Sequence, residues 1–304
     1  MSKVTRFLAT VKDRIGPLAF YAIRNLEQRV SPTGLYMALA PLAFARAAFS
    51  FSQRFPEYFC EPPSSRKAWR ARMNYLLGRG LEFIPDRLAT AKWQARFQTT
   101  GLVHIQEARE RKRSVVLVCF HFGAFKLIPF WLRSQGIPVI ALLGGESGSR
   151  SAAKRMKDKL SPFSPLPTVL YRKDQLRSVV RFLRTGHVLF VAVDRETGKR
   201  ITIPINEHCS FQMATGAIRL AAKCDAELIP CFMIDEGRWQ FRLEIGQPVP
   251  SEFLTTKLDN IGAAQHLLRE LLPVVSKHPE FCADYLVNCL RPNVSISGEK
   301  TFVE

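Results

Sequence analysis

The chain has 304 residues, 47% of them hydrophobic, so it can bury a core and an intrinsically disordered protein is excluded. Its 44 lysine and arginine residues outnumber 26 aspartate and glutamate residues, and the formal net charge of +18 indicates an anionic partner. The basic residues do not form the short blocks typical of nucleic-acid tails, so nucleic acid is not expected as a partner. The remaining candidates for the partner are anionic lipid, a phosphorylated substrate and an acidic carrier protein. The alternative is that the basic residues only form a solvated helix face.

The seven cysteines are odd in number and include no C-x-x-C pair. This pattern argues against a secreted disulfide framework and favours a reducing compartment. No two histidines have the spacing of metal ligands on a helix, and we predict neither a metal site nor a cofactor.

Residues 1–100 are predicted to form a basic, helical, membrane-associating cap, because prolines separate short helical stretches. Within this cap, residues 34–49 form an apolar run that is shorter than the roughly 20 residues needed to span a bilayer. A proline and an arginine interrupt the run, so we expect an interfacial helix. Three arginines would meet anionic headgroups there, namely Arg24, Arg29 and Arg54. The alternative is a core helix of a soluble domain.

From residue 101 to residue 304 the sequence predicts one compact α/β domain. Strand-like runs cover residues 115–120, 138–143, 168–171, 188–193, 227–234 and 238–245. Helical patterns cover residues 125–134, 151–160, 173–184, 213–224 and 261–276. Apolar strands that alternate with helices favour a mainly parallel, mixed sheet covered by helices on both faces. The run at 238–245 alternates polar and apolar residues, which indicates a half-buried antiparallel strand at an edge of the sheet.

A lone histidine, His121, follows the buried strand that ends at Phe120. Open α/β sheets place their ligands at the carboxyl ends of strands, so this position is a candidate catalytic site. An imidazole titrates near neutral pH and can act as a general base toward a hydroxyl when another group orients it. The alternative is a structural histidine.

A second group of polar residues follows the strand at 188–193. Asp194, Arg195 and Glu196 come directly after it, with Lys199 and Arg200 close behind. Carboxyl ends of parallel strands meet at one edge of a sheet, so we expect these side chains to converge with His121. A solvated loop with an internal ion pair is the alternative. The chain shows no nucleophile elbow, P-loop or dinucleotide fingerprint that would suggest other chemistry.

Taken together, these segments resemble the bacterial lipid A biosynthesis acyltransferase family. Ser114–Trp131 is similar to the His-Phe-Gly block of that family, and Asp194 opens a second series of blocks. The series continues in the family's order with residues 203–205, 214–221 and 226–230. The resemblance spans roughly residues 20–250, and the ordered pair of blocks is more specific than the His-Phe-Gly block alone.

The resemblance implies a glycerolipid and lipid A acyltransferase-like fold. The implied reaction moves a fatty acyl chain from an acyl carrier protein or coenzyme A thioester to a hydroxyl of a membrane glycolipid or phospholipid. His121 would be the general base. The implied location is the cytoplasmic face of the bacterial inner membrane, with peripheral or monotopic attachment. Arg150 or Arg155 stands where family members use an arginine after the second strand. The expected substrate-binding residues are Lys126, Arg150, Arg155, Arg195, Lys199 and Arg200.

The sequence departs from the family at Lys126, where members carry an aspartate or glutamate five positions after the histidine. A lysine ammonium has no lone pair with which to accept the imidazole N–H. Three explanations are open. Asp194 or Glu196 orients His121 instead, which we favour, or Lys126 binds a phosphate or carboxylate of a different acceptor. In the third explanation, the catalytic pair of histidine and carboxylate is broken, and the chain is a lipid-binding or acyl-carrier-binding homologue without turnover.

Overall fold

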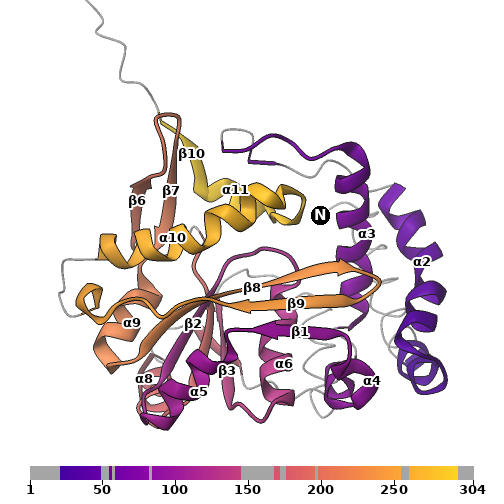
Figure 1. Cartoon of the computed structure of the whole chain (residues 1–304), viewed down its shortest axis with the longest axis horizontal. Helices are drawn as coiled ribbons and strands as arrows, with labels where there is room; N and C mark the ends of the chain where they lie inside the picture. The colour runs from indigo at the N-terminus through magenta and orange to yellow at the C-terminus, as the bar shows by residue number, and fades with distance from the viewer. Residues whose placement is uncertain are drawn as a thin grey trace, which may run out of the picture.

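A seven-stranded sheet forms the centre of the structure (Figure 1). The computed structural model describes residues 21–48, 55–56, 59–81, 84–144, 168–171, 176–195, 198–254 and 260–293. The strand order is β1 (Phe97–Thr100), β9 (Gln240–Ile245), β8 (Glu227–Gly237), β2 (Val115–Cys119), β5 (Val188–Ala192), β3 (Val139–Gly144) and β4 (Thr168–Tyr171). Strands β8, β2, β5, β3 and β4 are mutually parallel, whereas β9 is antiparallel to β8 and parallel to β1. The prediction of a mainly parallel mixed sheet is confirmed.

Helices cover both faces of this sheet, as the run of fully apolar strands requires. One face carries α2 (Pro32–Ala48), α3 (Ser65–Leu81), η1 (Pro85–Ala89), α4 (Ala91–Gln94), α5 (Leu102–Glu110), η2 (Phe125–Leu127) and α6 (Ile128–Ser134). The other face carries α8 (Leu176–Leu183), α9 (Gly216–Cys224), η4 (Ser251–Phe253), α10 (Asn260–Lys277), η5 (Pro279–Phe281) and α11 (Asp284–Cys289). Residues 21–29 form a further helical stretch.

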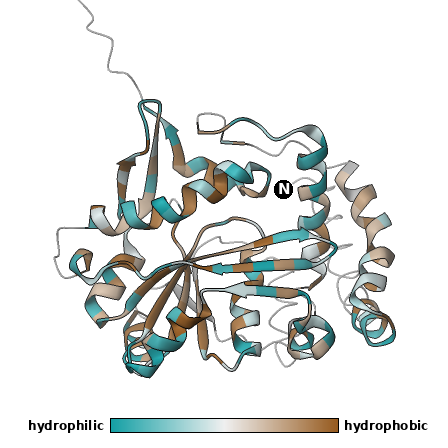
Figure 2. Cartoon of the chain, in the orientation of Figure 1, coloured by the Kyte–Doolittle hydropathy of each residue, from teal (hydrophilic) through white to brown (hydrophobic). Residues whose placement is uncertain are grey.

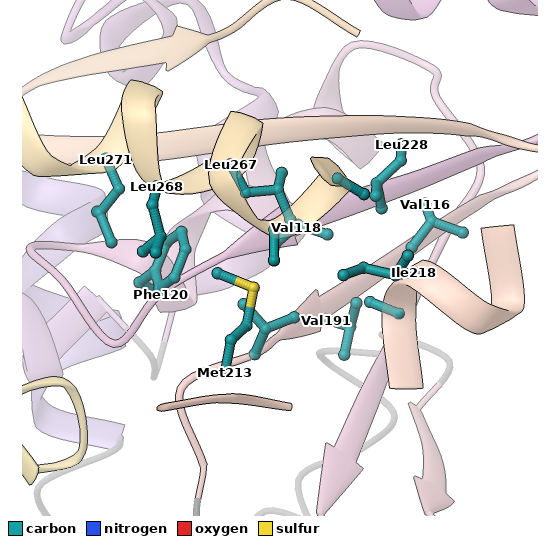
Figure 3. Packing of buried hydrophobic residues seen from close by; sticks show 14 of the residues in the cluster. Val116, Val118, Phe120, Val191, Met213, Ile218, Leu228, Leu267, Leu268 and Leu271 are labelled. Carbon is teal, nitrogen blue, oxygen red and sulfur yellow. The ribbon is translucent and has the colours of Figure 1, made fainter. Parts of the chain in front are cut away.

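Each face of the sheet has its own apolar core. Successive residues of β2 alternate between the two, because neighbouring side chains of a strand point to opposite faces. Val116 and Val118 meet Leu267 of α10 and Ile218 of α9 on one face, as the close-up in Figure 3 shows. The strands β2 and β3 are accordingly coloured as hydrophobic along most of their length in Figure 2. This packing fixes where β2 and β5 end, and therefore where the residues that follow them lie.

A small antiparallel sheet extends the second face. It contains β10 (Leu290–Pro292), β7 (Cys209–Ala214) and β6 (Arg200–Pro204) in that order. The sequence prediction missed this sheet and placed the start of a helix at Met213, which was wrong. Met213 lies in β7 with its side chain buried, and the helix begins at Gly216.

Two further expectations need correction. The strand at 238–245 is antiparallel, as expected, but it is not at the edge, because β1 pairs with its outer side. Its first two residues, Arg238 and Trp239, have positive φ angles and form the turn between β8 and β9, as two-residue hairpin loops require. β1 itself lies within the part of the chain that was expected to be helical. The predicted helix at 151–160 lies outside the described residues.

The apolar run at 34–49 corresponds to α2, which is partly core and partly surface. Leu35 is fully buried in the same core as the sheet, whereas Leu42 is 71% exposed. Among the described helices, none has the length and apolar character that crossing a bilayer demands. Arg24 does not face outward as expected, since its guanidinium forms two hydrogen bonds with the Asp86 carboxylate. Arg29 is exposed, and Arg54 lies outside the described residues.

Candidate active site

His121 and Asp194 follow two adjacent parallel strands, and the register between those strands brings them together. Cys119 of β2 is paired with Ala192 of β5. His121 comes two residues after Cys119, and Asp194 comes two residues after Ala192. Continuing the same register therefore places His121 and Asp194 side by side. Of the polar residues that were expected to converge with His121 at the carboxyl ends of parallel strands, this register brings Asp194 to it.

The two residues are joined by two hydrogen bonds to one carboxylate. Nδ1 of His121 lies 2.7 Å from Oδ1 of Asp194, and the backbone N–H of His121 donates to Oδ2 at 2.7 Å. Asp194 is completely buried. A buried carboxylate needs such donors to offset the loss of its hydration, and the pair of bonds also fixes the plane of the imidazole. The ring nitrogen left for other chemistry is Nε2.

Two aromatic rings enclose the imidazole. The ring of Phe125 lies 4.8 Å from it in an edge arrangement, and the ring of Tyr285 lies 4.8 Å from it at 43°. As a result the His121 side chain is only 8% exposed. Phe125 belongs to η2, shortly after the histidine, whereas Tyr285 comes from α11 near the other end of the chain. Sequence reasoning missed Tyr285, because no motif or periodic pattern singles it out.

The loop after His121 is held in a conformation that only glycine adopts easily. Gly123 has φ +56°, and a Cβ atom there would overlap the carbonyl oxygen of Met233 in β8. The close approach allows the N–H of Ala124 to donate to that carbonyl at 2.8 Å, while the N–H of Gly123 donates to Phe281 at 3.0 Å. The glycine of the His-Phe-Gly block therefore lets the loop dock on β8 and η5.

The N–H groups of Phe122, Gly123 and Ala124 are all engaged in hydrogen bonds with carbonyl oxygens. They are therefore not available to an oxyanion in this conformation. An anionic oxygen bound at this site would need donors other than these three N–H groups.

The expected cationic residues occupy different places. Arg195 is half-buried beside the site, with Cζ 5.1 Å from the centre of the Tyr285 ring. Lys126 is exposed on η2. Lys199 and Arg200 are exposed at the start of β6, where the Arg200 guanidinium donates to Gln212 Oε1 at 2.9 Å. Three other expected site residues, Glu196, Arg150 and Arg155, lie outside the described residues.

Two cysteines near the histidine are poor nucleophiles. Burial raises the pKa of the Cys119 thiol well above its ordinary value, and Cys231 and Asp194 add to the effect. Burial also raises the pKa of Cys282, with further contributions from Cys60, Asp194 and Glu280. A thiol that stays protonated is a poor nucleophile, so neither cysteine is a candidate for covalent catalysis. Within the described ranges, no three histidine, cysteine or carboxylate side chains come together as a metal site.

Comparison with known proteins places this chain in a wider group. The family model described as bacterial lipid A biosynthesis acyltransferase matches residues 81–285. That range includes His121, Asp194 and Tyr285. The lipid A biosynthesis lauroyltransferase of Escherichia coli (strain K12) is 29% identical over 155 residues. The aligned part covers 49% of this chain and 46% of that protein, so the chain spans about half the length of the curated relative it matches.

Proposed function

The chain belongs to the bacterial lipid A biosynthesis acyltransferase family, and on that premise we propose that it transfers a fatty acyl chain from a thioester donor to a hydroxyl of an anionic membrane lipid. The observation that carries the proposal is the buried pair formed by His121 and Asp194, 2.7 Å apart. Such a pair is the arrangement that a general base toward a hydroxyl requires.

The proposed reaction uses His121 as the base and Asp194 as the residue that orients it. With Nδ1–H donating to Asp194, Nε2 carries the lone pair and accepts the proton of the attacking hydroxyl. The oxygen forms a bond to the thioester carbonyl carbon, and a tetrahedral intermediate results. The C–S bond then breaks, and the imidazolium returns its proton to the leaving thiolate. The Asp194 carboxylate stabilises the imidazolium between these two steps.

The pair of His121 and Asp194 explains how the base can be oriented although position 126 carries a lysine. Family members use an acid there, but in this chain Nδ1 of His121 already has a carboxylate partner in Asp194. Lys126 is exposed, and in this proposal it has no part in orienting the base. We assign it to the substrates, together with Arg195, Lys199 and Arg200, because carrier-protein thioesters, coenzyme A and anionic lipids all present negative charge. The intact buried pair also leads us to favour turnover over lipid binding alone.

We place the reaction at a membrane surface, with α2 in contact with the lipid. Its exposed residues include Met37, Leu42 and Phe44, and the Phe44 ring packs on Trp69 of α3 at 5.4 Å. Arg66 and Lys67 are exposed on α3, which packs beside α2. An apolar helix face next to cationic side chains is the pattern of interfacial binding to anionic lipid. The expected site is the cytoplasmic face of the bacterial inner membrane.

The proposal is tested by mass spectrometry of membrane lipids from cells with and without the gene. We expect one lipid class to lose the mass of one acyl chain in the deletion strain. Wild-type protein should restore that mass, and the His121→Ala variant, produced at the same level, should not. An unchanged lipid profile in the deletion strain, or restoration by His121→Ala, would count against the proposed reaction.

A further inference from the structure

Tyr285 covers the outer side of the proposed base. Its ring lies 4.8 Å from that of His121, and the residue is 48% exposed while the histidine side chain is only 8% exposed. One side of the tyrosine ring therefore contacts the imidazole, and the remainder faces solvent.

The backbone fixes the place of this ring. The N–H of Ala283 donates to the carbonyl oxygen of His121 at 2.9 Å, and the N–H of Gly123 donates to Phe281 at 3.0 Å. Phe122 and Cys282 form an isolated antiparallel bridge between these two bonds. The segment that leads into α11 is thus tied to the histidine loop on both sides, and Tyr285 follows in the first turn of α11.

Tyr285 also contacts a cation. Cζ of Arg195 lies 5.1 Å from the centre of the tyrosine ring, which is within the range of a cation–π interaction. Arg195 directly follows Asp194, so its backbone is fixed by the same strand end. Among the described residues, no carboxylate is in ion-pair contact with the Arg195 guanidinium. This half-buried cation, which contacts the same tyrosine ring as the proposed base, is placed to meet an anionic group of a substrate.

We infer that Tyr285 is a positioning residue that holds the Arg195 guanidinium beside His121, where it binds a phosphate group carried by one of the two substrates. The inference rests on the proposed function, which supplies the phosphate-bearing substrates. A planar guanidinium presents paired N–H donors to phosphate oxygens. Stacking on an aromatic ring already restricts its orientation, so it loses less conformational entropy when phosphate binds. The phosphate belongs either to the headgroup of the lipid acceptor or to the coenzyme A or phosphopantetheine part of the donor.

The test is a binding measurement that does not depend on turnover. Two probes represent the two sources of phosphate: coenzyme A, and phosphatidylcholine vesicles with and without phosphatidic acid. Tyr285→Leu is expected to weaken binding of one of the two phosphate probes by about 3- to 30-fold, the range that a partly desolvated cation–π contact supplies. Tyr285→Phe keeps the ring and is the matched control, with affinity within about twofold of wild type.

Arg195→Gln should weaken binding of the same probe, and the double variant should bind no more weakly than Arg195→Gln alone. That lack of additivity separates positioning of Arg195 from a purely structural role for the tyrosine. Wild-type affinity in Tyr285→Leu for both probes, or fully additive losses in the double variant, would overturn the inference. Because His121 plays no part in the readout, failure here is distinguishable from absence of acyl transfer in the wild-type protein.

Discussion

Nδ1 of His121 and Oδ1 of Asp194 are 2.7 Å apart although 73 positions separate the two residues in the sequence. The same carboxylate accepts the backbone N–H of His121 at 2.7 Å. The two bonds couple the orientation of the imidazole to the ends of both β2 and β5. An imidazole held in this way loses little freedom when substrate arrives, which suits the general base role proposed for it.

The first prediction concerns the orienting carboxylate. Asp194→Asn should lower kcat by about 10²- to 10⁴-fold, because an amide NH₂ next to Nδ1 favours the tautomer whose proton sits on Nε2. The fold should survive, since asparagine fills the same volume. Steady-state kinetics and circular dichroism on the purified variant check both parts. Turnover within threefold of wild type would show that Asp194 does not orient the base.

The second prediction concerns Lys126. Because Asp194 already binds Nδ1 of His121, Lys126→Gln should change kcat by less than about threefold. We expect KM for the anionic substrate to rise, since an exposed cation contributes mainly to binding of charged partners. Kinetics with donor and acceptor varied in turn separate the two effects. A large loss of kcat with KM unchanged would place Lys126 in the chemical step.

The third prediction concerns the glycine of the histidine loop. Gly123→Ala should lower the free energy of unfolding by at least ~2 kcal/mol, because its Cβ would overlap the carbonyl of Met233 and its φ is positive. Gly136→Ala is the matched control: Gly136 has φ +73° but nothing lies within 4 Å of its added Cβ. That variant should lose only about 1 kcal/mol from backbone strain. Equal losses in denaturant titrations of the two variants would rule out the close approach as the cause.

The fourth prediction concerns a buried carboxyl group at the end of β8. Burial raises the pKa of Asp235 from 3.8 to about 7, although Gly237 donates its backbone N–H to the carboxyl and Arg70 lies nearby. Between these two pH values the folded state holds a proton that the unfolded chain has released. The free energy of unfolding is therefore expected to fall as pH rises from 4 to 7, by at most about 4 kcal/mol.

Asp235→Asn should remove this contribution, since an amide keeps the acceptor for Gly237 and does not titrate. The measurement is the free energy of unfolding at pH 5 and pH 8 for wild type and variant. Asp225→Asn, at an exposed carboxyl, serves as control and should leave the pH dependence unchanged. If Asp235→Asn retains the full difference between the two pH values, another group is responsible for it.

The fifth prediction concerns lipid contact by α2. Leu42→Glu should reduce partitioning into anionic vesicles by roughly 5- to 10-fold, because it removes an exposed apolar side chain and adds a like charge to the lipid. Val103→Glu alters an exposed apolar residue of α5 and is the control. Vesicle sedimentation at fixed salt compares the two. Equal losses for both variants would show that binding follows net charge alone.

The parallel core of the fold could be predicted from the sequence because each central strand is a continuous apolar run. The same observation predicted that Asp194 or Glu196 would reach His121, but it did not choose between the two carboxylates. β1 could not be found in this way. It has four residues, and its partner β9 lies more than a hundred positions further along the chain, so only the folded sheet defines it.

The small sheet and the role of α11 were missed for a related reason. β6 and β7 are short and are stabilised by pairing with each other and by packing under α10, not by a strong local pattern. Tyr285 reaches the site through backbone bonds between the segment at 281–283 and the histidine loop. Contacts of that range leave no periodic signal in a single sequence.

We propose that His121, held by Asp194, removes a proton from a lipid hydroxyl as that oxygen attacks a thioester. The most direct measurement is thiol release and ester formation by the purified protein, supplied with acyl carrier protein or coenzyme A thioester and a bacterial lipid extract. We expect the wild type to form one ester per thiol released and His121→Ala to form none above background. Ester formation by His121→Ala at the wild-type rate, or lipid binding by the wild type without any thiol released, would contradict it.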